Sequence, residues 1–563
     1  MVIKFPSKIL VLFILLATLL IGFTYVIRKD AGKIVHKTLH DYDESTDSVV
    51  SANLSRSLFP AMLRLNSLVD KAYETDGWLF NAYWQHRPPL YTYIPVPFFI
   101  VQGRPSIETE RLSFALVNFL TACVFIVAVF LFTGDAIPAV IATIAALIWI
   151  HGPFTRALVN GDWFGVSDIV LTFMTTCCLA VLLWYLSQEL SKRTVQSWQR
   201  LFFYGIVMSL PILTKNLLGM IPAATFFLIF LCDHWWVSRR SGTIRPLILT
   251  PFISFFMLLF LYYGSLFLSS PETFKIEFPV ALLHIWKNYE GWGRPWNWFI
   301  VNYLPLNYGI KKTLLLLLGG INLILFILRK RLKKKETVLF FITSGWFWWN
   351  LTAVSIITSK CPNFMFQSYL FFIFSVLYGS ILIIHKTMAY FLTLPTIPHV
   401  KRLLTGILIF LCILAGINIS SARKAIISAE CSYHYTTVNE RCYLLAERAR
   451  LTGWDWRDLI LLKTNLNDYW FPYYFMFLTG SEARTLDHFL YIANSQPRTQ
   501  FLQRLKEKYR RIIIIVKEQL IPGMPFLVGK TEDIRLSEIL PSTRIILLAP
   551  KEYDSFFSNV RSN

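Results

Sequence analysis

Acidic residues are scarce in this chain. Its 563 residues include 34 Asp and Glu against 55 Lys and Arg, which gives a formal net charge of +21. Charged residues of both signs make up only 16% of the chain, whereas 55% is hydrophobic, and the mean hydropathy is +0.49. This composition excludes an ordinary soluble enzyme of this length. Apolar runs of roughly 17–22 residues recur along the chain, and such runs are long enough to cross a bilayer as helices.

The excess of basic residues does not indicate a nucleic-acid partner. Lys and Arg gather in short links between the apolar runs, at 191–200, 238–245 and 329–336. Basic links of this kind are typical of the cytosolic loops of membrane proteins. A nucleic-acid binder would carry the same charge on a soluble face. We therefore expect an integral membrane protein that spans the membrane many times and has no nucleic-acid partner.

Two kinds of ligand motif are also lacking. The eight cysteines contain no CxxC pair and no Cys/His cluster with zinc spacing. The last 140 or so residues contain neither a GxGxxG nor a Walker A sequence. Most of the cysteines lie in apolar runs, where packing roles are typical. Cys431 and Cys442 follow the last apolar run and are a candidate disulfide if that region lies outside the cytosol.

The apolar runs predict about eleven transmembrane helices. The first, at about 9–27, is interpreted as a retained anchor with a cytosolic N-terminus, because no small-residue cleavage site follows it. The others are expected at about 111–132, 136–151, 167–187, 201–216, 218–236, 248–269, 312–328, 337–357, 363–384 and 403–421. This arrangement puts every strongly basic link in the cytosol and the loops 28–110, 152–166 and 270–311 outside it.

The chain changes character after about residue 421. Short β-branched runs at 459–464, 511–517 and 544–550 alternate with charged helical stretches, which predicts a small α/β domain on a parallel or mixed sheet. The fold class expected is thus a polytopic all-α membrane protein with a soluble C-terminal domain. We expect a transmembrane module over 1–421 and an extracytoplasmic α/β domain over 422–563.

Candidate acids lie at two external positions. Asp43 and Glu44 follow the first span, in the most polar part of the N-terminal half. Asp168 begins the fourth span, where a carboxylate is costly and tends to mark function. Two alternatives without a catalytic role stay open. The first pair could form a solvated acidic face, and Asp168 could cap a helix.

Candidate cations lie on the same predicted side. His86 and Arg87 precede Pro88-Pro89, Arg294 lies in a loop rich in Trp and Tyr that also holds His284, and Lys360 lies at another outer edge. Arginine suits phosphate binding, although an arginine beside lipid can also simply extend to the headgroups. The aromatic loop is either an interfacial belt or a sugar cleft. Together, these charges suggest a polyanionic lipid substrate and acid/base chemistry beside it.

The order of these motifs resembles the membrane glycosyltransferases of the GT-C fold, which take a sugar from a polyprenyl phosphate. The closest patterns are those of the lipid A aminoarabinose transferases and the protein O-mannosyltransferases. The matching elements are Tyr42-Asp43-Glu44, Trp84 to Leu90 (WQHRPPL), Arg111-Leu112-Ser113, Ser167 to Leu171 (SDIVL), Gly205 to Pro222 with its Leu-Thr-Lys-Asn segment, and Ser359-Lys360-Cys361-Pro362. The resemblance covers about residues 9–385.

The resemblance implies roles for these residues. Asp43 would be the catalytic base that activates the acceptor, with Glu44 and Asp168 in support. Arg87, Arg294 and Lys360 would hold the phosphate of a polyprenyl-phosphate sugar donor. The acceptor would be a lipid, glycan or protein hydroxyl, on the outer face of a bacterial plasma or inner membrane.

This chain departs from the pattern at three positions. His86 replaces the acid of the family's Glu-Lys-Pro-Pro element, Asn216 replaces a glycine, and Phe364 stands where an aromatic hydroxyl is common. The resemblance implies a divalent metal near the first position, which here would be held by His86 and His284, since imidazole can also bind zinc. A lipid or saccharide transporter or flippase is the alternative function, and a membrane scaffold is a third.

Overall fold

The computed structural model describes fourteen stretches of the chain. They are residues 8–29, 42–65, 68, 88, 90–152, 166–190, 197–241, 246–287, 293–307, 310–360, 362–393, 437–463, 471–517 and 543–561. The chain divides into two compact units. The first comprises residues 1–33, 114–263 and 281–432, and the second comprises residues 34–113, 264–280 and 433–563.

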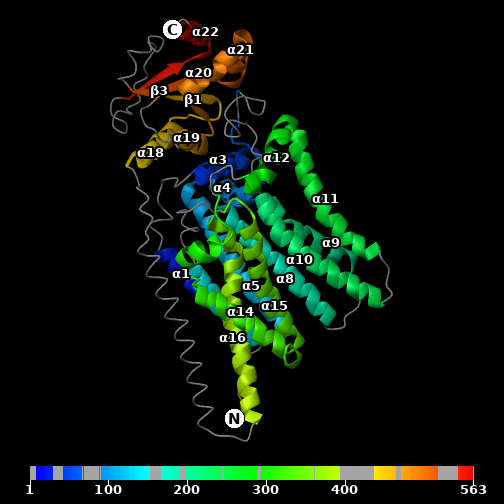
Figure 1. The fold of residues 1–563 in the computed structure, drawn as a ribbon. Helices are drawn as coiled ribbons and strands as arrows, with labels where there is room; N and C mark the ends of the chain where they lie inside the picture. The colour runs from blue at the N-terminus through cyan, green and yellow to red at the C-terminus, as the bar shows by residue number, and fades with distance from the viewer. Residues whose placement is uncertain are drawn as a thin grey trace. The chain divides into compact units, whose positions relative to one another are not determined.

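The first unit is a bundle of helices (Figure 1). Its long helices are α1 (Lys8–Lys29), most of α5 (Ile107–Thr133), α6 (Ala136–His151), α8 (Val166–Leu190), α9 (Trp198–Ser209), α10 (Ile212–Ser241), most of α11 (Pro246–Ser269), α14 (Lys312–Leu328), α15 (Lys334–Ile356) and α16 (Phe366–Thr393). Shorter helical pieces are η3 (Phe299–Tyr303), α13 (Leu304–Asn307), η4 (Arg329–Arg331) and η5 (Pro362–Met365).

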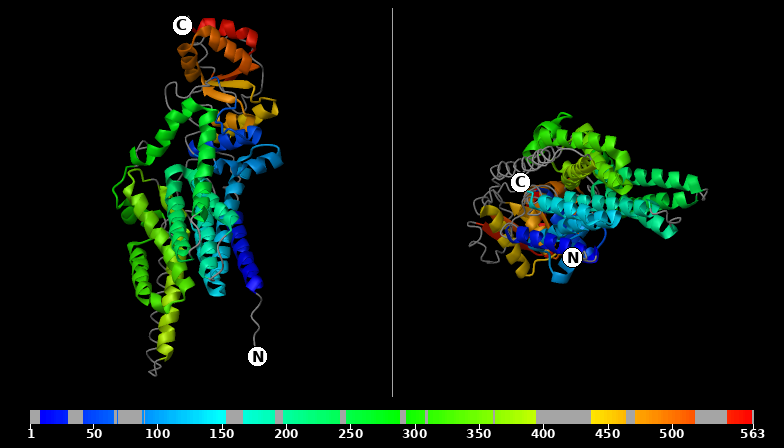
Figure 2. Two further views of the ribbon diagram at one scale, coloured as in Figure 1. Left: turned by 90° about the vertical axis from the view of Figure 1, so that its right-hand side faces the viewer. Right: turned by 90° about the horizontal axis from the view of Figure 1, so that it is seen from below.

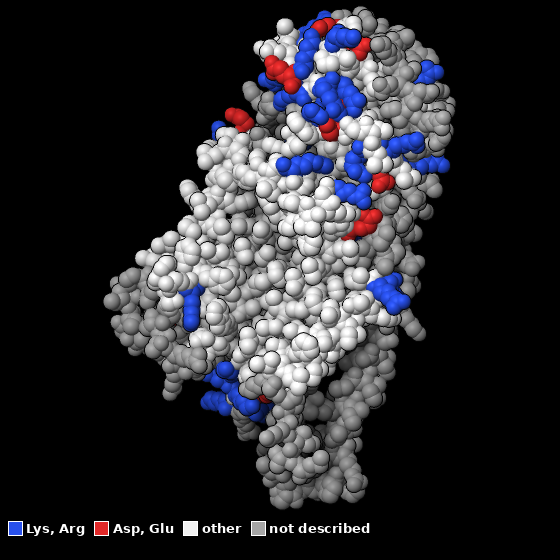
Figure 3. Space-filling view, turned by 180° about the vertical axis from the view of Figure 1, so that it is seen from behind, with Lys and Arg blue, Asp and Glu red and all other residues white. Residues whose placement is uncertain are grey.

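The expected membrane character is confirmed for most of these helices, but α9 and α15 do not meet the same criteria of length and apolar composition. Among the described residues, six helices are long and apolar enough to cross a bilayer, and α6 and α14 are shorter apolar helices. On the face shown in Figure 3, most of the described surface of the bundle carries no charge. The protein is therefore an integral membrane protein. The last expected span, at 403–421, lies outside the described residues.

Two helix boundaries differ from the sequence expectation. The expected pair of spans at 201–216 and 218–236 is divided six or seven residues earlier, so that α9 ends at Ser209 and α10 begins at Ile212. Pro211 between them has no N–H to donate, which favours a boundary there. The helix α10 is itself interrupted at Lys215 and Asn216, and a Cβ added at Gly219 would lie 1.8 Å from the Pro211 carbonyl oxygen. Only glycine fits this close approach.

Aromatic and apolar side chains hold the bundle together. The helix α8 packs against α10 and α16, α15 packs against α16, and α1 packs against α6 (Figure 2). Phe125 of α5 meets the rings of Phe371 and Phe374 edge-on, at centroid distances of 5.5 and 5.1 Å. Such pairs contribute about 0.5–1.5 kcal/mol beyond their buried area.

The second unit combines the first large loop with the C-terminal residues. From the loop come α3 (Tyr42–Ser57), η2 (Tyr91–Tyr93) and α4 (Val96–Gln102), and the start of α12 (Pro271–Lys287) also belongs to this unit. The C-terminal elements are α18 (Thr437–Leu451), β1 (Asp458–Lys463), α19 (Phe471–Thr479), β2 (Glu482–Thr485), α20 (Leu486–Ser495), α21 (Arg498–Lys508), β3 (Arg511–Lys517), β4 (Thr543–Leu548), η8 (Pro550–Glu552) and α22 (Tyr553–Arg561).

The sheet of this unit is mixed, which is one of the two expected alternatives, a parallel or a mixed sheet. Its strand order is β2-β1-β3-β4, with β1 parallel to both β2 and β3, and β4 antiparallel to β3. Three of its strands were predicted within two residues. The strand β2 was not, because its sequence, Glu-Ala-Arg-Thr, is short and polar.

Alternate residues of the strands build two cores. Ile513 and Ile515 face a core shared with α18, α19 and α3, and Ile512 and Ile514 face a core shared with α20, α21 and α22. This is the period of two expected when both faces of a sheet are covered. The helix α3 therefore lies in the same core as the C-terminal sheet (Figure 1).

A buried ion cluster ties the same loop to β2. The carboxylate of Glu482 accepts hydrogen bonds from the hydroxyl of Tyr509, the guanidinium of Arg484 and, at 3.1 Å, the backbone N–H of Leu68. Arg64 also lies 3.8 Å from it. Burial alone would raise the pKa of Glu482, but the two guanidinium groups and the hydrogen bonds outweigh burial and hold that pKa below its usual value.

Candidate active site

The helix α3 presents the predicted acidic pair in its first turn. Tyr42 is its first residue, so Asp43 and Glu44 lie where the helix dipole favours negative charge. The side chain of Asp43 lies outside the described residues. Although α3 is polar in composition, every described side chain from Glu44 to Leu54 is buried. Glu44 is thus enclosed by protein and is not part of a solvated face.

A bidentate ion pair fixes Glu44. The Nε and Nη2 atoms of Arg111, in the first turns of α5, donate to the two carboxylate oxygens at 2.8 and 3.1 Å. Both side chains are buried. Two parallel bonds of this kind hold both partners in one orientation. Arg111 belonged to the matching elements in the sequence, but its partner was not predicted.

Two further carboxylates complete this cluster, and sequence reasoning missed both as site residues. Asp47 follows Glu44 by three residues, so both face the same side of α3, and it accepts a hydrogen bond of 2.6 Å from the Tyr91 hydroxyl. Glu110 is buried within the electrostatic reach of Glu44, Asp47 and Arg111. The helical spacing of Asp43, Glu44 and Asp47 was the available signal.

In the first unit, Asp168 forms a second ion pair. Its Oδ2 atom lies 2.6 Å from Nζ of Lys215, with side-chain exposures of 3% and 18%. Asp168 occupies the first turn of α8, as expected, and Lys215 lies in the interruption of α10. In the sequence, Lys215 belongs to the Leu-Thr-Lys-Asn segment among the matching elements. The structure places it in a helix break, with its ammonium group directed to a carboxylate.

The break in α10 shapes the surroundings of this pair. Asn216 has φ +38° and ψ −123°, a positive-φ conformation that residues other than glycine rarely adopt. Its Oδ1 atom accepts a hydrogen bond of 2.9 Å from the hydroxyl of Tyr263. The ammonium group of Lys215 also lies 5.7 Å from the centre of the Phe364 ring, a cation–π distance.

The other two described cations lie near one segment. Ser359 forms an isolated antiparallel bridge with Gly293. Arg294 follows Gly293 and Lys360 follows Ser359, so each cation is adjacent in sequence to one residue of the bridge. Lys360 is buried and donates to the carbonyl oxygen of Ile357, and burial lowers its pKa. Arg294 is exposed. Lys215, Arg294 and Lys360 are therefore gathered around residues 359–364 of the first unit.

The remaining predicted residues lie outside the description. Arg87 and His86 are not described, and neither is the side chain of His284. Within the described stretches, no three His, Cys, Asp or Glu residues are grouped so that they could hold a metal ion. The metal site at His86 and His284 stays a prediction. Cys431 also lies outside the described residues, so its disulfide with Cys442 stays a prediction as well.

Comparison with known proteins identifies the fold. No family model matches this chain, and no curated protein matches it by sequence. Among solved structures, it is similar to ArnT from Cupriavidus metallidurans bound to undecaprenyl phosphate, with a TM-score of 0.55, 15% identity, and coverage of 95% of this chain and 97% of that one. The apo state of the same protein gives a TM-score of 0.52 at 16% identity, with the same coverage.

A second solved protein supports the same fold. The apo oligosaccharyltransferase of Archaeoglobus fulgidus has a TM-score of 0.50 at 13% identity, and the match covers 93% of this chain and 71% of that one. At these identities, the likeness concerns the arrangement of the backbone. The chain has the GT-C fold of polytopic membrane glycosyltransferases, as the motif order predicted.

Proposed function

We propose that this protein is a membrane glycosyltransferase that moves a sugar from a polyprenyl-phosphate donor to a hydroxyl group of a lipid, glycan or protein. The observation that carries the proposal is the buried, paired state of its acidic residues in a chain with the GT-C fold. Glu44 and Asp168 each lie in a buried ion pair. Burying charges costs free energy, and proteins tend to place such charges at functional sites. ArnT bound to undecaprenyl phosphate shows that a protein of this fold takes such a lipid.

The reaction in this proposal is a single displacement. Asp43 accepts the proton of the acceptor hydroxyl, and the freed oxygen attacks the anomeric carbon of the sugar. The bond between that carbon and the phosphate oxygen breaks, and the polyprenyl phosphate leaves with the electron pair. The configuration at the anomeric carbon is inverted. Arg111 holds Glu44, and through it the first turn of α3, in one orientation.

The cations of the first unit suit the leaving phosphate. Lys215, Arg294 and Lys360 are gathered around one segment, and Arg87 would add a fourth positive charge. Charges placed where negative charge develops lower the barrier without an added acid, because a phosphate is already a good leaving group. Asp168 keeps the ammonium group of Lys215 fixed at 2.6 Å. When bound, a divalent metal at His86 and His284 would supply further positive charge.

The site would lie outside the cytosol, together with the C-terminal domain. Two observations support this placement. The basic links fall on the opposite side of the predicted spans. In addition, α3 and the C-terminal sheet share one core, so both must be on the same side of the membrane. Alkaline phosphatase fused after Asn563 should be active in a bacterial host, and an inactive fusion would contradict the placement.

Mass spectrometry of cells tests the activity. We would compare lipids and surface glycans of cells that express the wild-type protein, no protein, Asp43→Asn or Glu272→Gln. Glu272 is exposed and makes a matched control for the loss of one carboxylate. One acceptor should carry an additional sugar mass in the wild type and the control, and should lack it in the other two strains.

Two outcomes would contradict the proposal. If Asp43→Asn retains the sugar mass at wild-type protein levels, Asp43 is not the base. If no acceptor changes mass, but the purified protein moves a fluorescent polyprenyl-phosphate analogue between the leaflets of a vesicle, the protein is a flippase.

A further inference from the structure

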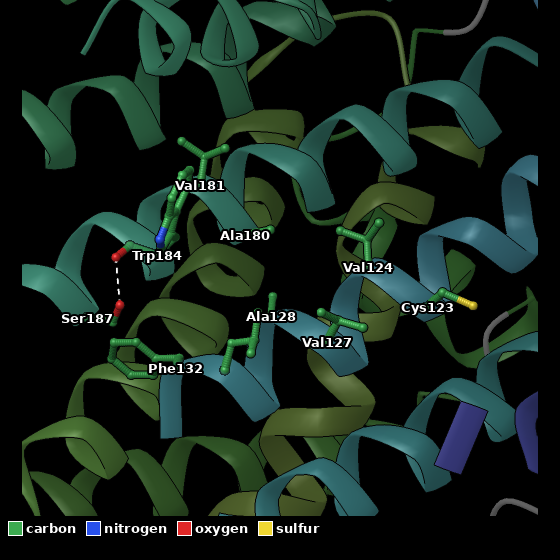
Figure 4. Close-up of a pocket in the computed structure, with 10 residues that line it drawn as sticks. Cys123, Val124, Val127, Ala128, Phe132, Ala180, Val181, Trp184 and Ser187 are labelled. Atoms are coloured by element: carbon green, nitrogen blue, oxygen red, sulfur yellow. Dashed lines mark hydrogen bonds between the residues drawn. The ribbon is translucent and has the colours of Figure 1, made fainter. Parts of the chain in front are cut away.

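An apolar groove lies between α5 and α8, at the end of the bundle away from Asp168. It has a volume of about 350 Å³. Figure 4 shows small side chains of the two helices, such as Val124, Ala128 and Ala180, on its opposing walls. The groove extends along α5 from Cys123 to Phe132, which is about 13 Å at 1.5 Å per residue. That length is close to half of a hydrocarbon core of about 30 Å, or one leaflet.

Two cations mark one end of this groove. The guanidinium carbon of Arg200 lies 5.9 Å from the centre of the Trp184 ring, and Nζ of Lys335 lies 5.7 Å from the centre of the Phe132 ring. Both rings line the groove. Arg200 and Lys335 begin α9 and α15, so they come from two different basic links of the chain. Apolar walls with positive charge at one end complement a molecule with an apolar tail and an anionic head.

We propose that the groove binds one acyl chain of an anionic phospholipid of the cytosolic leaflet, with the lipid phosphate held by Arg200 and Lys335. Basic residues that flank membrane helices on the cytosolic side attract anionic headgroups. Ser187 and the indole of Trp184 add polar groups at the same end, and Trp is frequent at that depth.

This lipid site is separate from the proposed donor site. Asp168 and Trp184 belong to the same helix, and their separation of 16 positions corresponds to about 24 Å. A donor whose phosphate lies near Lys215 therefore cannot place that phosphate at Arg200. The inference does not depend on the proposed transferase activity, because it concerns binding at the other end of α8.

Native mass spectrometry of the full-length protein in detergent tests the charge requirement. Dioleoyl phosphatidylglycerol or dioleoyl phosphatidylcholine would be added at equal concentrations. We expect one phosphatidylglycerol to remain bound to the wild type, with at least tenfold weaker retention in the Arg200→Gln/Lys335→Gln double variant. The Arg329→Gln/Lys330→Gln variant is the matched control, because it removes one Arg and one Lys from exposed positions. It should bind as the wild type does.

A second pair of variants tests the groove itself. Ala180→Leu fills the groove, whereas Gly320→Leu adds the same kind of side chain to an open position on α14, where an added Cβ meets no atom within 4 Å. Only Ala180→Leu should weaken phosphatidylglycerol binding. Equal losses in both charge variants would show general attraction to anionic lipid and overturn the proposal. Displacement of the bound lipid by equimolar undecaprenyl phosphate would overturn it too, because the groove would then hold a carrier lipid.

Discussion

The pair of Glu44 and Arg111 determines how much change the acidic turn of α3 tolerates. Both side chains are buried, and the guanidinium group makes two bonds to one carboxylate. Removing one partner of a buried pair costs about 3–5 kcal/mol, because an uncompensated charge remains. Exposed pairs such as Arg457 with Asp455 contribute much less, because water screens the two charges.

The variant Arg111→Met should therefore unfold at a much lower temperature than the wild type, and should lose transfer activity. Arg111→Lys should be intermediate, because lysine keeps the charge but cannot form the two-bond geometry. Thermal unfolding in detergent, followed by tryptophan fluorescence, measures the effect. Arg457→Gln is the control and should unfold near the wild-type temperature. An Arg111→Met protein as stable as this control would show that the pair contributes little.

The ion pair of Asp168 and Lys215 should act as one unit in catalysis. Asp168→Asn and Lys215→Met should each lower the transfer rate by about a hundredfold, which is the usual cost of removing one electrostatic contact from an active site. The double variant should be about as slow as either single variant, because the second change removes nothing further. Transfer rates of the purified proteins decide this. Losses that multiply to about ten-thousandfold would mean that the two residues work independently.

The sequence predicted the positions of these residues better than their partners. Asp168 was placed at the start of its span because apolar residues follow it, and Glu44 because it follows the first anchor. Their partners lie 47 and 67 residues away in the chain. No periodicity links residues at such separations, so the pairs depend on tertiary packing. Asp47 is different, because its helical spacing from Glu44 was visible in the sequence.

At the scale of the element, the break in α10 accounts for an unusual residue. The family that the chain resembles usually has glycine at the position of Asn216, and the φ of +38° found here is one that glycine adopts at little cost. Asparagine at this position is compensated by its hydrogen bond with Tyr263. Strain of this kind costs about 1–3 kcal/mol and tends to occur at functional sites.

The variant Asn216→Gly should thus be close to neutral in stability, because it loses one hydrogen bond of about 1 kcal/mol but relieves the backbone. Asn216→Val should lose both and unfold at a lower temperature, since a β-branched residue is disfavoured at positive φ. Thermal unfolding of the two variants distinguishes them. Tyr263→Phe serves as the control for the hydrogen bond alone. A stable Asn216→Val protein would rule out backbone strain at this position.

The strand β2 gives the C-terminal domain a dependence on pH. Because Arg484 and Arg64 hold the pKa of Glu482 below its usual value, the ionised form stabilises the fold. This contribution is fully present above the pKa of an unfolded glutamate, about 4.3, and is lost as the pH falls through the lower folded value.

The unfolding temperature of the wild type should therefore fall steeply below about pH 4.5, whereas Glu482→Gln should be less stable at pH 7 and depend less on pH in that range. Differential scanning fluorimetry between pH 3 and 8 measures both curves. Asp487→Asn, in an exposed pair with Lys463, is the control and should follow the wild type. Parallel curves for the wild type and Glu482→Gln would show that another group governs the acid range.

At the scale of the whole molecule, hydropathy and the basic links predicted most of the membrane helices. The length of an apolar run is a local property of the chain, so it can be read directly from the sequence. The loop at 270–311 shows the limit of this signal. It contains the helix α12, whose mixed composition, with Pro279 inside it, matched neither an apolar span nor a simple loop. The packing of α3 against α19 could not be predicted from the sequence either, because much of α3 is polar in composition.

A chain that ends at Ser432 should insert into the membrane and yet be inactive. It would lack the sheet and α19, so that Val49, Val50 and Leu54 of α3 would lose their core. Membrane fractionation measures insertion, limited proteolysis of residues 34–113 measures order, and transfer measures activity. A chain that ends at Arg561 is the control and should behave as the wild type. Transfer by the shorter chain would show that the acidic loop is ordered without its partner.

The shared core of α3 and the C-terminal sheet also determines when α3 can finish folding during biosynthesis. At about 5–20 residues per second, the 323 residues between Ser113 and Thr437 take roughly 16–65 s to synthesise. During that interval, α3 has left the ribosome, but α19 and the strands that share its core have not. If the protein has the proposed activity, a chain that ends before Thr437 should therefore be inactive, because α3 lacks part of its core. The helix α3 can therefore complete its core only after residues 437–517 and 543–548 have been made.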